Sequence, residues 1–198
     1  AIISAGVLAY EVLLLRVFSF SQWHHFASLA VSLALLGFGT AGTSLALLGK
    51  RAVRWGDTLF LAGLFLSAAG MVLSFVLTRN LQVRPLFALW NAGELGKLLL
   101  LDFVAFLPFF GAALSIGQVF MRWPGSVPRL YGANLLGSGV GSLSATLLLS
   151  TVSLQAALLV VPFALLIFGA LYGGFLAKSS AGKNVVATAS AIGVLLLA

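Results

Sequence analysis

Charged side chains are scarce in this chain of 198 residues. Lys, Arg, Asp and Glu together make up 8% of it, whereas a soluble domain carries roughly 25% of them. So few charges cannot cover the surface of a water-soluble protein of this size. Lipid must therefore be the solvent for most of the surface, and a soluble catalytic domain such as a dinucleotide-binding domain is excluded from this chain.

Cysteine is absent, which excludes disulfides, thiolate metal sites and cysteine nucleophiles. The two histidines, His24 and His25, are adjacent, and neighbouring residues of a helix diverge by roughly 100°. They are therefore poorly placed to bind one metal ion together. We expect them to form a polar cap with Trp23 at the membrane interface, and we expect no metal and no cofactor.

Long hydrophobic runs are what the chain does contain, with 61% hydrophobic residues and a mean hydropathy of +1.15. A helix crosses the hydrocarbon core with about 20 apolar residues. The sequence therefore predicts an all-α membrane bundle of about seven transmembrane helices in a single domain. The predicted spans are 1–20, 26–49, 58–78, 98–121, 130–151, 155–177 and 184–198.

The longest connection, 79–96, contains a stretch at 85–92 that we expect to form a short helix in the membrane interface, with Trp90 at headgroup level. The chain begins and ends inside apolar runs, so we expect it to be part of a longer protein.

Basic residues between the spans predict the orientation, because cytoplasmic loops carry an excess of Lys and Arg. The formal net charge is +7, which we attribute to topology and to contacts with anionic lipid and not to nucleic acid binding. The N-terminus is predicted to be cytoplasmic, in the inner membrane of a bacterium. The loops after the second, fourth and sixth spans carry Lys50, Arg51, Arg54, Arg122, Arg129, Lys178 and Lys183. The loops after the first, third and fifth spans carry Arg79, Arg84 and Lys97.

Ionisable groups inside the predicted spans require a partner, because each costs about 2.5 to 3.5 kcal/mol on insertion scales. We predict that Arg16 pairs with Asp102 between the first and fourth spans, at the same depth. Glu11 lies near the midplane, where we expect it to face the interior, protonated or hydrogen-bonded to Thr40 or Thr43. These groups either lock the helices together or form a polar ligand or proton site.

Further polar and small residues predict contacts between helices. Gln118 and Asn134 share a depth in the fourth and fifth spans, so we expect a hydrogen bond between their amides. Small residues that recur every four positions allow backbones to approach closely. We therefore expect packing seams at two clusters, which join helices within the bundle or between protomers. Their glycines are Gly37 and Gly39 in the second span and Gly137 and Gly141 in the fifth.

Two stretches of the chain carry motifs in a fixed order. The first has a small Ser-Gly start, then Tyr10-Glu11 and Arg16. The second joins Leu107-Pro108-Phe109-Phe110 to the helix start Arg129-Leu-Tyr-Gly-Ala-Asn134-Leu-Leu-Gly137. Together they resemble bacterial spermidine synthase-like membrane proteins. Asn134 stands where the family pattern has an acidic residue, which removes a charge at that position.

The resemblance implies a membrane module joined to a soluble aminopropyltransferase-like domain, which would hold the catalytic residues. The module would serve as an anchor or partner surface for that domain or for other membrane subunits. We find no catalytic serine–histidine–acid set, no paired catalytic carboxylates and no phosphate loop in the chain itself. Two alternatives are a transporter of polyamine-like molecules or cations, and a subunit of a respiratory or photosynthetic complex.

Overall fold

The computed structural model describes residues 1–21, 27–81 and 90–177, and these residues form helices and turns without a strand. The predicted all-α fold is confirmed. Five segments are long and apolar enough to cross a membrane, which makes the chain a membrane protein by length and composition. They are Ser28–Leu48, Gly56–Asn80, Ala92–Arg122, Pro124–Thr151 and Leu154–Leu176.

Single residues join α2 to α3 and α3 to α4, and short turns join α5 to α6 and α6 to α7. Gly49 has a positive φ of 49° and turns the chain between the second and third helices. The predicted spans within the described residues begin and end within six residues of the observed helices. The elements are α1 (Ile2–Ser21), α2 (Ala27–Leu48), α3 (Lys50–Arg54), α4 (Gly56–Asn80), α5 (Ala92–Arg122), the 3-10 turn η3 (Pro124–Ser126), α6 (Val127–Thr151) and α7 (Leu154–Ala177).

Some expectations fall outside the described residues. These are the histidine cap at 23–25, the predicted seventh span at 184–198 and most of the predicted interfacial helix at 85–92. Trp90, at the end of that last stretch, lies in a turn, and α5 begins two residues later at Ala92.

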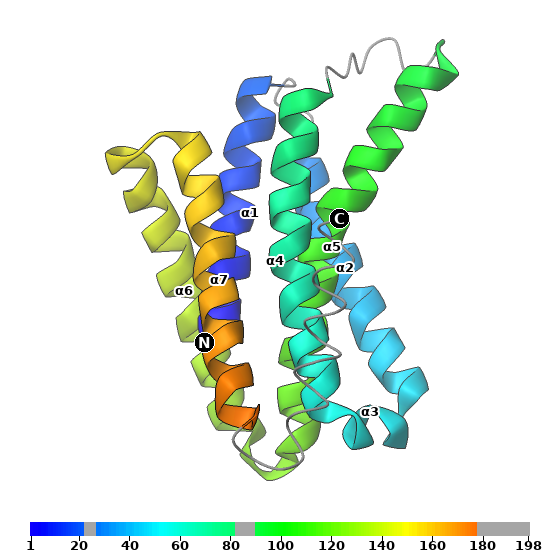
Figure 1. The fold of residues 1–198 in the computed structure, drawn as a ribbon, viewed down its shortest axis with the longest axis vertical. Coiled ribbons are helices and arrows are strands. Elements are labelled where there is room, and N and C mark those ends of the chain that lie inside the picture. Colours follow the sequence, from blue (N-terminus) through cyan, green and yellow to red (C-terminus); the bar gives the residue numbers. More distant parts are fainter. Residues whose placement is uncertain (22–26, 82–89, 178–198) are drawn as a thin grey trace.

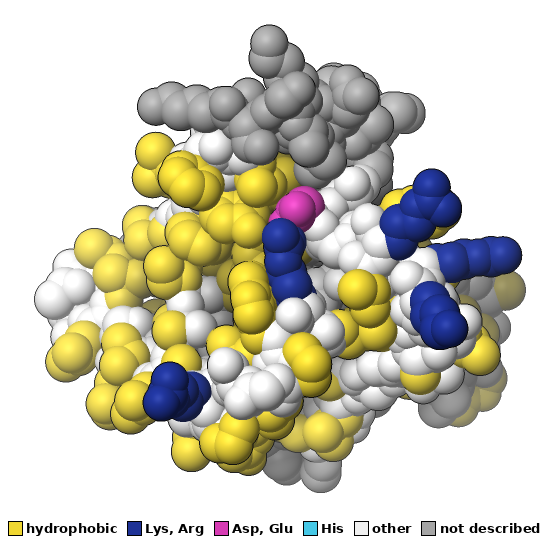
Figure 2. All heavy atoms as spheres, turned by 90° about the horizontal axis from the view of Figure 1, so that it is seen from below, with side chains coloured by type: hydrophobic (Ala, Val, Ile, Leu, Met, Phe, Trp, Pro, Cys, Tyr) yellow, Lys and Arg dark blue, Asp and Glu magenta, His cyan; other side chains and the backbone are white. Residues whose placement is uncertain are grey.

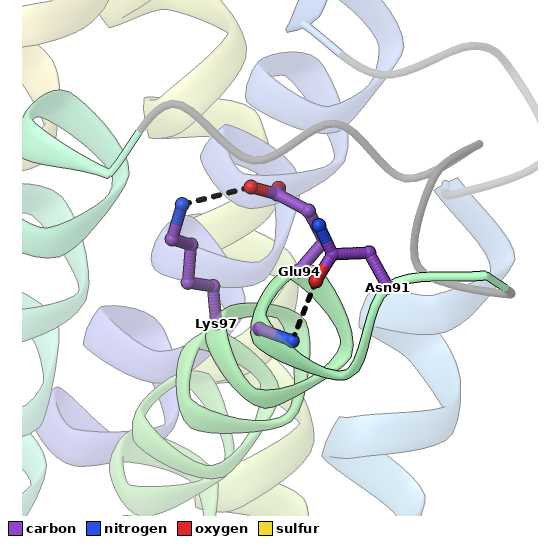
Figure 3. Close-up of polar contacts among 4 residues, drawn as sticks. Asn91, Glu94 and Lys97 are labelled. Carbon is purple, nitrogen blue, oxygen red and sulfur yellow. Dashed lines mark hydrogen bonds and ion pairs between the residues drawn. The ribbon is translucent and has the colours of Figure 1, made fainter.

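The start of α5 is fixed by polar groups that complement its first turn (Figure 3). The Asn91 side chain accepts a hydrogen bond from the Gly93 backbone N–H at 2.9 Å, as an N-cap does. Glu94 lies in the first turn, where a negative charge favours the helix dipole, and pairs with Lys97 at 2.8 Å. These contacts explain why α5 begins six residues before the predicted span and reaches 31 residues.

The bundle is arranged around α1 and α4, as Figure 1 shows. Helices α6 and α7 lie on one side, and α2 and α5 lie on the other. Helix α1 packs mainly against α6, and also against α7 and α2, whereas the most extensive contact of the bundle joins α4 to α5. The N-terminal half of α5 leans outward from the bundle (Figure 1).

Glycine sets the distance between α4 and α5. A Cβ at Gly63 would lie 2.6 Å from the backbone oxygen of Gly111, and one at Gly111 would lie 2.5 Å from the oxygen of Gly63. Ser115 of α5 adds an interhelical hydrogen bond, since its hydroxyl donates to the Phe60 carbonyl at 2.7 Å. The sequence prediction missed this crossing, although Gly111 and Ser115 have the four-residue spacing of a small-residue seam.

Three of the four predicted packing glycines lie at helix crossings. A Cβ at Gly137 or Gly141 would collide with the α1 backbone at Ala1 or Ala5, so α6 lies directly against α1. A Cβ at Gly37 would come within 2.6 Å of the Phe109 Cβ, between α2 and α5. Gly39 differs, because a Cβ there would meet no atom within 4 Å. It is two residues from Gly37 and therefore faces away from α5, so it does not pack against another helix of the described bundle, and a seam between protomers stays a prediction.

Large apolar side chains divide between the bundle interior and its outer surface. Tyr10, Phe109 and Leu13 are among the largest fully buried side chains. Leu47 and Phe175, in contrast, are 84% and 75% exposed. Contiguous apolar exposure is unusual on a soluble monomer, whereas here it provides the surface that the hydrocarbon of the bilayer covers.

Candidate polar sites in the bundle

Glu11 is half-buried on α1 and does not receive the predicted threonine contacts. Thr40 donates its hydroxyl proton to the Leu36 and Gly37 carbonyls, at 2.7 and 3.2 Å. Thr43 donates to the Gly39 carbonyl at 2.9 Å. A threonine has one hydroxyl proton, and hydroxyls inside helices commonly bond to a preceding carbonyl. The predicted hydrogen bond to Glu11 is therefore wrong.

The predicted ion pair between Arg16 and Asp102 is also wrong. Lys97 pairs with Glu94 and Arg122 pairs with Asp57, and Asp102 belongs to neither pair. One carboxylate oxygen of Asp102 is buried without a hydrogen-bond partner within the described part of the chain.

Gln118 and Asn134 are not bonded to each other. The Asn134 side chain accepts a hydrogen bond from the Ser4 hydroxyl, which joins α6 to α1. Both amide atoms of Gln118 are buried without a partner among the described residues. Helix α6 packs against α1 through its glycines, and its contact with α5 is slight. The predicted hydrogen bond is therefore wrong, because α6 has α1 and not α5 as its main neighbour.

Tyr10 is the centre of a buried hydroxyl network that joins α1 to α4. Its side chain is fully buried, and its hydroxyl contacts that of Ser74. The Ser74 hydroxyl donates to the Met71 carbonyl at 2.9 Å. Since a serine has one proton to donate, Tyr10 must be the donor to Ser74. Sequence reasoning missed this pair, because hydroxyl side chains inside apolar runs are visible in the sequence but their partners are not.

A cavity of about 220 Å³ lies beside this network, between α1, α4 and α7. In Figure 1, α1 is seen behind and between α4 and α7. Most of the wall is apolar, and polar groups of α1, α4 and α7 complete it. The apolar wall is formed by Leu14, Val17, Phe75, Leu154 and Leu158, and the polar groups belong to Tyr10, Ser74, Thr78, Arg79 and Gln155.

A second cavity, of about 140 Å³, lies at the opposite end of the bundle between α4, α5 and α7. Asp57 and Arg122 form an ion pair there. The Arg122 guanidinium also lies 5.2 Å from the centroid of the Trp123 ring. Gln118 lines the same cavity and is 3% exposed. The sequence prediction placed Asp57 and Arg122 at the same end of the bundle but did not pair them.

Basic side chains gather at this second end, which Figure 2 shows from below. We call it the basic end. The short helix α3 brings exposed Lys50, Arg51 and Arg54 there, together with exposed Trp55. The exposed Arg129 at the start of α6 and the paired Arg122 lie at the same end. Cations that flank membrane-spanning helices in this way are attracted by anionic lipid headgroups.

Within residues 1–21, 27–81 and 90–177, no three His, Cys, Asp or Glu side chains gather into a group that could hold a metal ion. Comparison with known proteins finds no matching family model, no similar curated protein and no similar solved structure.

Proposed function

We propose that the chain is the membrane module of a bacterial spermidine synthase-like protein, and that it anchors a soluble aminopropyltransferase-like domain at the cytoplasmic face. The observation that carries the proposal is the close contact of helix backbones at Gly63, Gly111, Gly137 and Gly141. Helices in such contact cannot slide without steric collision. A rigid bundle suits an anchor, whereas alternating access in a transporter requires one part of the bundle to rock against another.

The basic end indicates which end of the bundle faces the cytoplasm. Five Lys or Arg residues (Lys50, Arg51, Arg54, Arg122 and Arg129) and one acid (Asp57) lie there among the described residues. A basic excess marks the cytoplasmic side. The proposed soluble domain would therefore lie against α3 and the α5–α6 turn.

The mass of the natural protein tests the proposal first. The 198 residues of the chain amount to 20.6 kDa. We expect the intact protein, purified from membranes of cells that carry the natural gene, to exceed this mass by a whole soluble domain. We also expect it to transfer an aminopropyl group to a polyamine acceptor. A natural mass near 20.6 kDa, together with polyamine uptake into liposomes, would refute the anchor and support the transporter.

The absence of cysteine allows a direct test of orientation. Gly125→Cys places a thiol at the basic end, where the position is exposed and has open space around it. Asn80→Cys places one at the exposed end of α4, on the other side of the bundle. In intact bacteria, a membrane-impermeant maleimide should label Asn80→Cys and should label Gly125→Cys only after permeabilisation. The reverse pattern would invert the proposed topology.

A further inference from the structure

The cavity between α1, α4 and α7 combines an apolar wall with a cation at its edge. Leu14, Phe75 and Leu158 belong to the wall. Arg79 lines the cavity from the last turn of α4. It is exposed and forms no ion pair with another residue of the described chain. An apolar cavity with one charged group at its edge is complementary to an amphiphile, not to a fully polar solute.

We propose that this cavity binds an anionic amphiphile with a single aliphatic chain. Arg79 would hold the anionic head group, and the apolar wall would hold the first part of the chain. The inference is independent of the aminopropyltransferase proposal, since it rests on the cavity alone.

The charge of the head group follows from the groups around Arg79. No carboxylate lines the cavity within the described residues, so the guanidinium attracts an anion. Carboxylates and phosphates accept two parallel hydrogen bonds from arginine. Leu154 and Gln155 in the first turn of α7 line the same cavity. The N-terminal end of a helix carries a partial positive charge, which adds to the attraction.

The size and the lining of the cavity favour an aliphatic chain on the ligand. A dry cavity of about 150 Å³ holds benzene, so the 220 Å³ available here is enough for several methylene groups. The Tyr10–Ser74 hydroxyl pair lines one side, and its protons are already used within the pair and on the Met71 carbonyl. These hydroxyls therefore do not demand a polar ligand, and the chain meets apolar carbon.

The location of the cavity matches the depth of a lipid head group. Thr78 and Arg79 from the C-terminal turn of α4 and Gln155 from the N-terminal turn of α7 lie at the end of the bundle away from the basic end. In the proposed topology this is the outer leaflet side. The amphiphile would enter from the membrane with its head group in the interface.

Ligand binding by the purified chain in a neutral maltoside detergent tests the proposal. Laurate supplies the carboxylate and one chain, dodecanol supplies the chain without charge, and phosphatidylglycerol supplies a phosphate on two chains. Native mass spectrometry and the ligand-induced shift in Tm should both show binding of laurate. Dodecanol should bind about tenfold more weakly or worse, because it cannot form the charge-assisted hydrogen bonds to Arg79.

Arg79→Gln should weaken laurate binding about tenfold, and Arg79→Lys should restore part of the loss. Arg51→Gln is the matched control, since it removes an exposed cation at the basic end, and it should bind laurate as the wild type does. Equal binding by Arg79→Gln, equal loss in Arg51→Gln, or equal binding of dodecanol and laurate would each overturn the proposal. If phosphatidylglycerol binds and laurate does not, the proposal of a single-chain ligand is overturned and the cavity is a phospholipid site.

Discussion

Two kinds of helix junction differ sharply within this bundle. At the α4–α5 crossing, Gly63 and Gly111 bring the backbones together and no room is left for a further atom. At the α1–α4–α7 junction, the larger Tyr10 and Phe75 side chains stand between the helices, beside a cavity of about 220 Å³. Apolar side chains gain little by leaving lipid for one another, so close packing drives association in a membrane. The difference indicates that paired glycines close a helix crossing, whereas the aromatic junction of α1, α4 and α7 leaves space beside its side chains.

The substitution with the largest expected effect disrupts a glycine crossing. Gly111→Ala places a Cβ 2.5 Å from the Gly63 carbonyl oxygen and 2.6 Å from the Ser67 nitrogen. Both are backbone atoms, so the helices must separate. We expect a loss of about 3 kcal/mol in the free energy of unfolding, at the upper end of the cost of overpacking.

Gly96→Ala is the matched control on the same helix, because a Cβ there meets no atom within 4 Å. It should raise the free energy of unfolding by about 0.5 kcal/mol, since alanine is the better helix former. Both values can be measured by unfolding in mixed detergent micelles followed by circular dichroism. Equal and small effects of the two substitutions would show that the α4–α5 crossing is looser than the structure indicates.

The second prediction concerns the hydroxyl pair at the aromatic junction. Ser74→Ala leaves the buried Tyr10 hydroxyl without its acceptor, whereas Tyr10→Phe leaves the Ser74 hydroxyl still donating to Met71. An unsatisfied buried donor costs more than a bond whose two partners are both lost. We expect Ser74→Ala to lower the free energy of unfolding by about 2 kcal/mol. We expect Tyr10→Phe to lower it by about 0.6 kcal/mol through the loss of the hydroxyl.

The double variant Tyr10→Phe with Ser74→Ala distinguishes the cost of an unpaired Tyr10 hydroxyl from the cost of lost side-chain volume. It should be more stable than Ser74→Ala alone, because the orphaned hydroxyl is gone. Thermal unfolding of the four proteins provides the comparison. Additive losses in the double variant would mean that the two hydroxyls do not interact.

The sequence predicted the helices well and their neighbours poorly, and the reason is physical. Hydropathy and length define a span from local information, so the ranges of α2 and α7 were predicted to within a residue or two. Pairing depends on which face of each helix meets which neighbour. Arg16 and Asp102 share a depth in the sequence-based topology, yet Asp102 belongs to neither ion pair of the described residues. The face that a helix turns to each neighbour is set by side-chain packing and not by the hydrophobic period.

Glycine seams were predictable only where the spacing was regular. Gly137 and Gly141 recur every four residues and meet α1. Gly37 and Gly39 stand in one cluster, but only Gly37 faces a helix, because two residues on a helix differ by roughly 200° in direction. The Asp57–Arg122 pair was hidden for another reason, since both residues fall in predicted loops whose geometry the sequence does not define.

The smallest expected effect concerns Gln118, whose amide lies beside the second cavity without a partner among the described residues. Leucine is close to glutamine in size and has no polar atoms to desolvate. Gln118→Leu should therefore raise the free energy of unfolding by about 1 kcal/mol. Gln155→Leu is the control, because Gln155 is exposed and lines the other cavity, and it should change the stability little. Detergent unfolding of both variants measures the difference. A loss of stability in Gln118→Leu would instead mean that the amide bonds to something held in the 140 Å³ cavity, and the basic end would then contain a binding site as well.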